Sequence, residues 1–189
     1  MLDKLFGWGK KKETPVPAAP HIRFGRYSDN NKTVEKTRRW TDADNLFKDK
    51  KYHESILSFF DYLRDDALQN VTAVKRGDDI EFELYQGSKV VRGRCNASSL
   101  TAEVSLAAMK QTSVPVMRRL LEQNFNLYYS RYALKNDTLC MRFDSDIQSA
   151  NPNKLYYSLK ELATRADKQD DLLVQDLAAL LPVDTAHIE

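Results

Sequence analysis

Residues 80–95 have the sequence IEFELYQGSKVVRGRC, in which apolar and polar side chains alternate on both sides of Gly87-Ser88. Alternation with a period of two predicts two strands, and a glycine at the first turn position supplies the positive φ of a type II′ hairpin. The turn then sets these residues opposite each other: Ile80 and Cys95, Glu81 and Arg94, Phe82 and Gly93, Glu83 and Arg92, Leu84 and Val91. One face is wholly apolar and the other carries opposite charges, so we predict an antiparallel sheet with one buried and one solvated face.

Strand patterns continue on both sides of this hairpin. Upstream, a three-residue loop at Gly77–Asp79 predicts an extra strand from Val71, with Val74 opposite Phe82 and Lys75 opposite Glu81. Downstream, Leu100–Leu106 alternates and predicts another strand, with a helix opening at Ser98–Glu103 as the alternative.

A second hairpin is predicted around Asn136-Asp137, joining strands at Tyr128–Leu134 and Thr138–Phe143. On one face its register pairs Leu134 with Leu139, Tyr132 with Met141 and Ser130 with Phe143; on the other it pairs Ala133 with Cys140, Arg131 with Arg142 and Tyr129 with Asp144. The opposition of two arginines requires a nearby acid, a partner carboxylate or solvent to offset the repulsion.

Helices are predicted before, between and after these strands. A capping box at Thr41–Asp44 predicts the first helix, whose apolar positions extend to Leu63 with a break near Asp49–Lys51. Pro115 suits the first turn of the second helix, which we expect to end at Asn126 with one apolar stripe of Val116, Leu120, Leu121 and Phe125. Asn151-Pro152 predicts the N-cap of the third, with apolar residues Leu155, Leu159, Leu162 and Ala166; it either continues to Leu181 or breaks near Asp167–Asp170.

The chain has 189 residues and a net charge of +2, and its composition indicates three regions. We expect a flexible, basic, proline-containing tail over residues 1–40, an α+β domain over 41–181 and a short C-terminal tail over 182–189. Residues 1–40 contain ten Lys or Arg and four Asp or Glu, while the remainder is mildly acidic, so the composition argues against a nucleic-acid-binding protein. The two cysteines, Cys95 and Cys140, are expected to be buried apolar residues of a cytoplasmic protein.

The sequence after residue 112 resembles a known family. Residues 113–127, SVPVMRRLLEQNFNL, form a proline-initiated helix with a Leu-Leu-Glu-x-Asn motif, and Tyr129, Tyr132 and Leu134 follow the Tyr-x-x-Tyr/Phe-x-Leu spacing of the next hairpin. These features resemble the YbjN-like family, whose members are similar to type III secretion chaperones. The resemblance extends over about residues 41–180 by element order and is specific over 113–162. It implies an α-β-β-β-α-β-β-α fold, frequent homodimers, and peptide or protein binding rather than catalysis.

The sequence contains few motifs that indicate a metal site, a cofactor site or a catalytic site. The histidines His21, His53 and His187 show no metal-ligand spacing, and no phosphate-binding glycine loop or nucleophile elbow is present, so we expect no metal, no cofactor and no enzyme activity. The best candidate contact surface combines Tyr129, Arg131, Arg142, Arg92 and Arg94, for an unidentified protein or peptide.

Two other functions stay open. One is a small-ligand sensor or enzyme with a site on the sheet, which requires a pocket with perturbed titratable groups. The other is a peripheral membrane scaffold that uses residues 1–12, where apolar residues from Leu2 to Trp8 precede Lys10–Lys12.

Overall fold

The computed structural model describes residues 32–65, 70–109, 113–176 and 180–183. Its helices are α2 (Val34–Lys48), α3 (Tyr52–Leu63), α4 (Val114–Asn124) and α5 (Pro152–Asp176), with a short 3-10 turn η1 (Ile147–Ser149). Its strands are β1 (Val71–Arg76), β2 (Asp79–Gln86), β3 (Lys89–Cys95), β4 (Ser99–Met109), β5 (Arg131–Lys135), β6 (Thr138–Asp146) and β7 (Leu180–Pro182).

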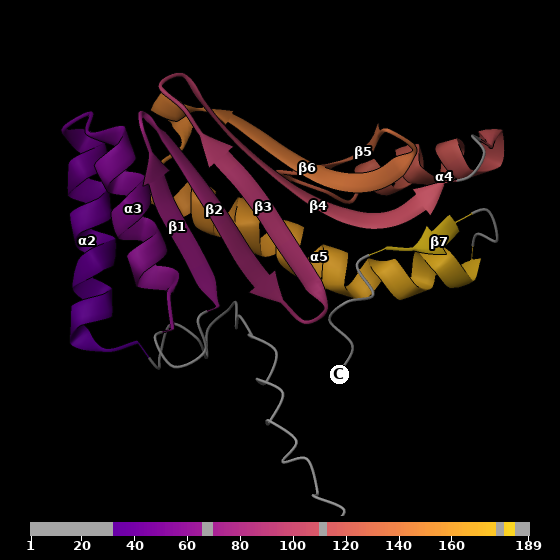
Figure 1. The fold of residues 1–189 in the computed structure, drawn as a ribbon, viewed down its shortest axis with the longest axis horizontal. Coiled ribbons are helices and arrows are strands. Elements are labelled where there is room, and N and C mark those ends of the chain that lie inside the picture. The colour runs from indigo at the N-terminus through magenta and orange to yellow at the C-terminus, as the bar shows by residue number, and fades with distance from the viewer. Residues whose placement is uncertain (1–31, 66–69, 110–112, 177–179, 184–189) are drawn as a thin grey trace, which may run out of the picture.

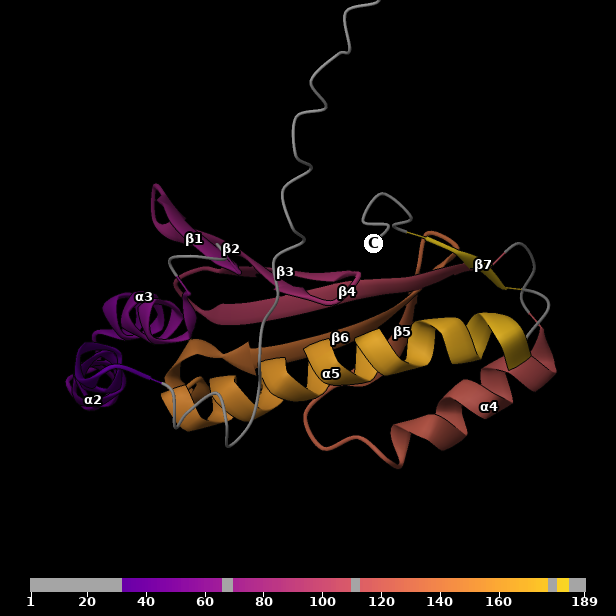
Figure 2. The same cartoon turned by 90° about the horizontal axis from the view of Figure 1, so that it is seen from below.

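The strands form one antiparallel sheet in the order β1-β2-β3-β4-β6-β5, and β7 pairs with the end of β4 (Figure 1). Viewed along the sheet, all the described helices lie on one side of it (Figure 2). The predicted α+β class, with an antiparallel sheet and helices on one face, is therefore confirmed. The predicted extra strand is β1, and the predicted strand beginning at Leu100 is the long β4.

Both hairpins centred on tight turns have the predicted registers. Every predicted pair from Ile80–Cys95 to Leu84–Val91 is present, and Gly87 has a φ of +52°. In the second hairpin, Asn136 and Asp137 both have positive φ, and the pairs from Arg131–Arg142 to Leu134–Leu139 are present. The predicted pairs of Ser130 and Tyr129 do not form, because β5 begins only at Arg131.

The predicted register of the first strand is wrong by one residue. Val74 lies opposite Glu81 and Lys75 opposite Ile80, because Gly77 and Asp78 make a two-residue turn. A shift of one residue exchanges the faces of a strand. Val71 is consequently buried, whereas Val74 is 52% exposed on the polar face.

The first helix begins earlier than predicted. Its N-cap is Thr33, whose side chain accepts a hydrogen bond from the backbone N–H of Lys36, so the capping box predicted at Thr41 is wrong. The expected boundary between residues 40 and 41 falls inside this helix. Trp40 anchors the extra turns, because its ring packs 5.0 Å from the ring of Tyr62. The predicted break is confirmed, with Lys50 in the left-handed region at φ 62°.

The core lies between the sheet and α5. The predicted apolar residues of this helix, Leu155, Leu159, Leu162 and Ala166, are fully buried. Asn151 caps it by accepting a hydrogen bond of 2.9 Å from the Lys154 N–H, as predicted. The helix continues without a break to Asp176, whereas Leu181 belongs to β7.

Candidate functional site

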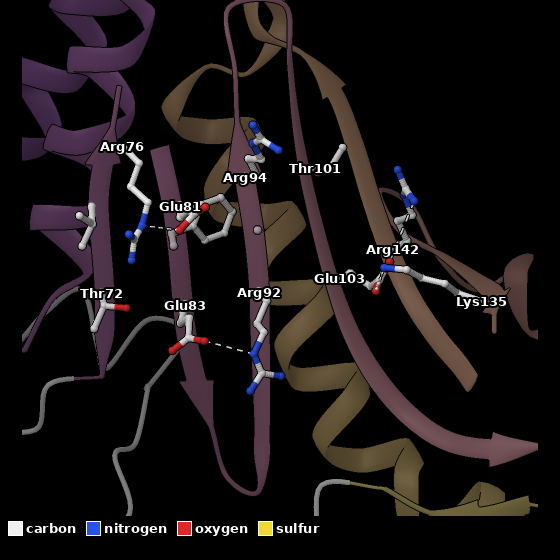
Figure 3. A pocket seen from close by; sticks show the side chains of 13 residues that line it. Thr72, Arg76, Glu81, Glu83, Arg92, Arg94, Thr101, Glu103, Lys135 and Arg142 are labelled. Carbon is white, nitrogen blue, oxygen red and sulfur yellow. Dashed lines mark hydrogen bonds and ion pairs between the residues drawn. The ribbon is translucent and has the colours of Figure 1, made fainter. Parts of the chain in front are cut away.

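The helix-free face of the sheet carries an open groove with a volume of about 670 Å³ (Figure 3). Side chains of six strands line it, and most of them are charged: Thr72, Val74, Arg76, Glu81, Glu83, Arg92, Arg94, Thr101, Glu103, Lys135 and Arg142, with Phe82 and Gly93 between them. The groove thus brings together three of the predicted site residues, Arg92, Arg94 and Arg142.

The arginines of β3 are already neutralised by acids of β2. Arg92 donates a hydrogen bond of 3.1 Å to the Glu83 carboxylate, and Arg94 forms an ion pair with Asp79. Arg76 of β1 lies 2.7 Å from the Glu81 carboxylate in the same way. These pairs follow directly from the registers, because residues opposite or diagonal on one face are within reach of long side chains.

The opposed arginines of the second hairpin share one acid. Asp144 accepts a hydrogen bond of 2.8 Å from Arg142 Nε and also forms an ion pair with Arg131. Glu103 lies 2.8 Å from Lys135 Nζ and 4.0 Å from an Arg142 nitrogen. A local acid, Asp144, therefore offsets the repulsion between the two arginines. The hydrogen bond from Arg142 to Asp144, together with the negative charge of Asp144, raises the pKa of Arg142.

Of the other two predicted residues, Arg131 lies beside the groove through its ion pair with Asp144 and is not among the lining residues, and Tyr129 does not line the groove either. It lies in the connection between α4 and β5, which the carboxylate of Glu161 on α5 holds in place. This carboxylate accepts hydrogen bonds of 2.8, 3.0 and 2.8 Å from the backbone N–H groups of Tyr128, Tyr129 and Ser130, and one of 2.7 Å from the Ser130 hydroxyl. Burial raises the pKa of Glu161, but these hydrogen bonds outweigh it and leave the pKa below its usual value.

A surface that sequence reasoning missed lies on α4. The helix buries Val116 and Leu120, but Leu121 and Phe125 of the expected single stripe are 63% and 91% exposed. Val114 is exposed as well, and its spacing to Leu121 and Phe125 places the three side chains on one helix face. Tyr128, 90% exposed, follows in the connection to β5. The sequence did contain a sign of this surface, because the apolar stripe of this helix is wider than the face that one contact with the core can bury.

We call Val114, Leu121, Phe125 and Tyr128 the α4 surface. Its support is rigid, because the opposite side of α4 is part of the core and Asn124 accepts a hydrogen bond of 2.8 Å from the Tyr132 N–H. Exposed apolar side chains gathered on an ordered element mark interaction sites more often than scattered ones do.

The two cysteines are buried, as predicted. Burial raises the pKa of Cys95 to about 11, with a smaller effect from the nearby Asp79, and burial also raises the pKa of Cys140. Neither thiol has the lowered pKa of a reactive cysteine. Among the described residues no group of His, Cys, Asp and Glu is placed to hold a metal ion, and no described helix has the length and apolarity to cross a membrane. His21, His187 and residues 1–12 lie outside the described part of the chain.

Comparisons with known proteins give weak likenesses to solved structures that bear on the fold. No protein-family model matches the chain, and no curated protein does. Among solved structures, a chain of the heterodimeric ExoU–SpcU complex of the Pseudomonas aeruginosa type III secretion system matches with 10% identity and a TM-score of 0.39, over 57% of this chain and 86% of its own. The Yersinia pestis type III secretion chaperone SycH, in complex with a fragment of YscM2, matches with 16% identity and a TM-score of 0.39, over 67% of this chain and 98% of that one. Likenesses of this size assign no function to the chain.

Proposed function

We propose that this domain is a non-enzymatic protein-binding module, and that a segment of its partner docks on the α4 surface. The observation that supports the proposal most is the exposure of Leu121 and Phe125 on the outer side of a helix whose other face is anchored in the core, together with the exposure of Tyr128 in the connection that follows. Aromatic residues are enriched at protein interfaces, where they provide much of the binding energy.

The connection after α4 strengthens the proposal. Glu161 holds the backbone of Tyr128 and Tyr129 through direct hydrogen bonds, so Tyr128 is presented from an ordered loop. An ordered surface loses less conformational entropy when a partner binds, which favours affinity. Tyr129, predicted as a contact residue and 42% exposed, belongs to this same connection.

The charges beside the α4 surface indicate the chemistry of the partner. Arg118 lies one helical turn from both Val114 and Leu121, and among the described residues it has no ion pair, whereas its neighbour Arg119 lies 3.7 Å from Glu122. A partner segment with apolar side chains flanked by Asp or Glu fits this pattern. A second copy of the chain fits it less well, since two α4 helices in contact would bring like charges together.

The open groove is the second candidate, for an extended segment that lies across the sheet. Its volume of about 670 Å³ and its lining by Arg92, Arg94 and Arg142 favour it. Against it, each of these arginines already has an acid within the sheet, so an acidic ligand has to displace Glu83, Asp79 or Asp144. The chaperone-like role and the homodimer implied by the YbjN-like resemblance remain predictions.

A displayed library of random peptides, panned on the whole protein, distinguishes the candidates. We expect enriched peptides with apolar residues flanked by Asp or Glu, whose binding is lost in Leu121→Ser/Phe125→Ser and weakened in Arg118→Glu. Val34→Ser is the matched control, because Val34 is 89% exposed on α2. Peptides that bind the α4 variants normally but fail with Arg131→Glu/Arg142→Glu would place the site on the open groove and contradict the proposal.

A further inference from the structure

A small pocket of about 290 Å³ lies where α2, α3 and α5 meet, away from both surfaces described above. It is lined by Thr37, Trp40, Tyr62, Asn153, Tyr156 and Tyr157. The aromatic rings support one another: the centroid of Trp40 lies 5.0 Å from that of Tyr62 and 6.0 Å from that of Tyr156, and Tyr156 lies 5.3 Å from Tyr157. The walls of this pocket are therefore mostly aromatic and held in place by ring contacts.

Several polar groups of the pocket can donate hydrogen bonds. The indole N–H of Trp40 can only donate, and the Asn153 amide and the Tyr157 hydroxyl can donate as well. No residue in the described part of the chain hydrogen-bonds to these three groups. They are available to carbonyl oxygens of a ligand.

Two lysines at the pocket make it unsuitable for a cationic ligand. Lys32 Nζ lies 4.9 Å from the centroid of the Tyr62 ring, and Lys160 Nζ lies 5.7 Å from that of Tyr156. The faces of the Tyr62 and Tyr156 rings, which would attract a cationic ligand, are therefore already occupied by lysine side chains. A ligand that carries no positive charge, is largely apolar and is rich in hydrogen-bond acceptors fits the pocket.

A proline-rich segment in the polyproline II conformation has these properties. Proline has no backbone N–H to donate, the backbone makes no internal hydrogen bonds, and such segments dock into aromatic-lined grooves. We propose that this pocket is a binding site for a polyproline II segment, and that its occupant is Thr14–Pro20 of the same chain. That segment, TPVPAAP, is uncharged and contains Pro17 and Pro20 in Pro-x-x-Pro spacing.

The chain is long enough to make this contact. Lys32, where the described residues begin, donates a hydrogen bond of 2.8 Å to the carbonyl of Tyr62 and so lies beside the pocket. The linker from Pro20 to Lys32 spans on the order of 20 Å if it behaves as a flexible coil, and up to roughly 40 Å if extended. A ligand tethered so closely has an effective concentration in the millimolar range. The segment thereby competes with any proline-rich segment of another protein, independently of the α4 surface.

Fluorescence of Trp40 tests the proposal in the full-length chain. The protein has two tryptophans, so Trp8→Phe leaves Trp40 as the only reporter. In this background we expect Pro15→Ala/Pro17→Ala/Pro20→Ala to raise the acrylamide quenching constant of Trp40 roughly twofold or more, because an indole covered by the segment becomes exposed. Ala18→Ser/Ala19→Ser, which keeps the prolines, is the control and should leave quenching unchanged.

A synthetic peptide of residues 12–22 completes the test. Added to the Pro15→Ala/Pro17→Ala/Pro20→Ala variant, it should restore the protection of Trp40, and Tyr157→Ala should weaken its binding roughly threefold to tenfold because one aromatic contact is lost. Tyr157 is 52% exposed, so this substitution spares the core. Unchanged quenching of Trp40 in the Pro15→Ala/Pro17→Ala/Pro20→Ala variant, or a peptide that does not protect Trp40, overturns the proposal.

Discussion

Replacing Glu161 by glutamine should destabilise the protein at neutral pH by loosening the connection between α4 and β5. Oε1 of this carboxylate accepts hydrogen bonds from the N–H groups of Tyr129 and Ser130 and from the Ser130 hydroxyl, while Oε2 accepts one from the Tyr128 N–H. Glutamine keeps one acceptor oxygen but turns an NH₂ group toward the remaining donor. The charge that strengthens all four hydrogen bonds is also lost.

The expected loss in the free energy of unfolding is about 1–2 kcal/mol. A hydrogen bond to a charged group contributes roughly 1.5–3 kcal/mol and a neutral one roughly 0.5–1.5 kcal/mol, so one lost and three weakened bonds would together cost about 4–6 kcal/mol at a fully buried site. Because Glu161 is only partly buried, solvent reduces the effect of its charge. Local opening of the connection to β5, rather than global unfolding, should account for part of the change.

The loss of stability caused by Glu161→Gln should depend on pH, and the pKa of Glu161 fixes the direction of this dependence. The hydrogen bonds of Glu161 leave its pKa in the folded protein below the usual value. A carboxylate of this kind stabilises the fold above its unfolded pKa of about 4.3, and the contribution is lost as the pH falls through the folded pKa. The difference between wild type and Glu161→Gln should therefore be largest at neutral pH and shrink in acid.

Urea unfolding of both proteins at several values between pH 7 and pH 3 measures this difference, and amide hydrogen exchange at Tyr128–Ser130 localises it. Glu122→Gln is the control, because Glu122 is exposed on α4 and its side chain makes one polar interaction among the described residues, the ion pair with Arg119. A loss that is equal at all pH values, or absent at pH 7 while the exchange rates stay unchanged, would refute the reasoning.

Other substitutions test the packing and the caps. Gly93→Ala should cost about 1–3 kcal/mol in urea unfolding, because a Cβ there would lie 2.0 Å from the buried ring of Phe82; wild-type stability would show that the ring moves freely. Asn151→Ala should lower stability by about 1 kcal/mol through loss of the α5 cap, whereas no change in the melting temperature would mean that water replaces it. Burial and a pKa of about 11 should keep Cys95 unreactive toward a thiol reagent at pH 8 until urea unfolds the protein, so rapid modification of the native protein at this cysteine would contradict its placement.

The elements that could be predicted were those with local causes. The registers around Gly87-Ser88 and Asn136-Asp137 follow from two-residue turns and alternating side chains, and the start of α5 follows from Asn151-Pro152. The predicted register of β1 was wrong because the local sequence at Gly77 suits a two-residue turn as well as a three-residue turn. Packing decides between them: the shorter turn places Val71 in the core and leaves Val74 on the polar face.

The candidate sites were less predictable than the fold. Sequence reasoning placed Arg92, Arg94 and Arg142 on one face, and the structure brings them into one groove together with their acids. It did not separate Tyr129 from them, because the position of a connection depends on residues far along the chain. The hydrogen bonds from Tyr128–Ser130 to Glu161 join positions more than thirty residues apart and leave no local pattern.

The sequence by itself determined the α+β class, the two hairpin registers, the solvated charged face and the apolar face of α5, because each depends on neighbouring residues or on a simple period. Only the tertiary structure decided the strand order β1-β2-β3-β4-β6-β5, the early start of α2 around Trp40, and which half of the α4 stripe is buried. The physical reason is that apolar side chains from distant parts of the chain compete for the limited space in one core. Val116 and Leu120 fill the space beside the sheet, so Leu121 and Phe125, equally apolar in sequence, remain in solvent.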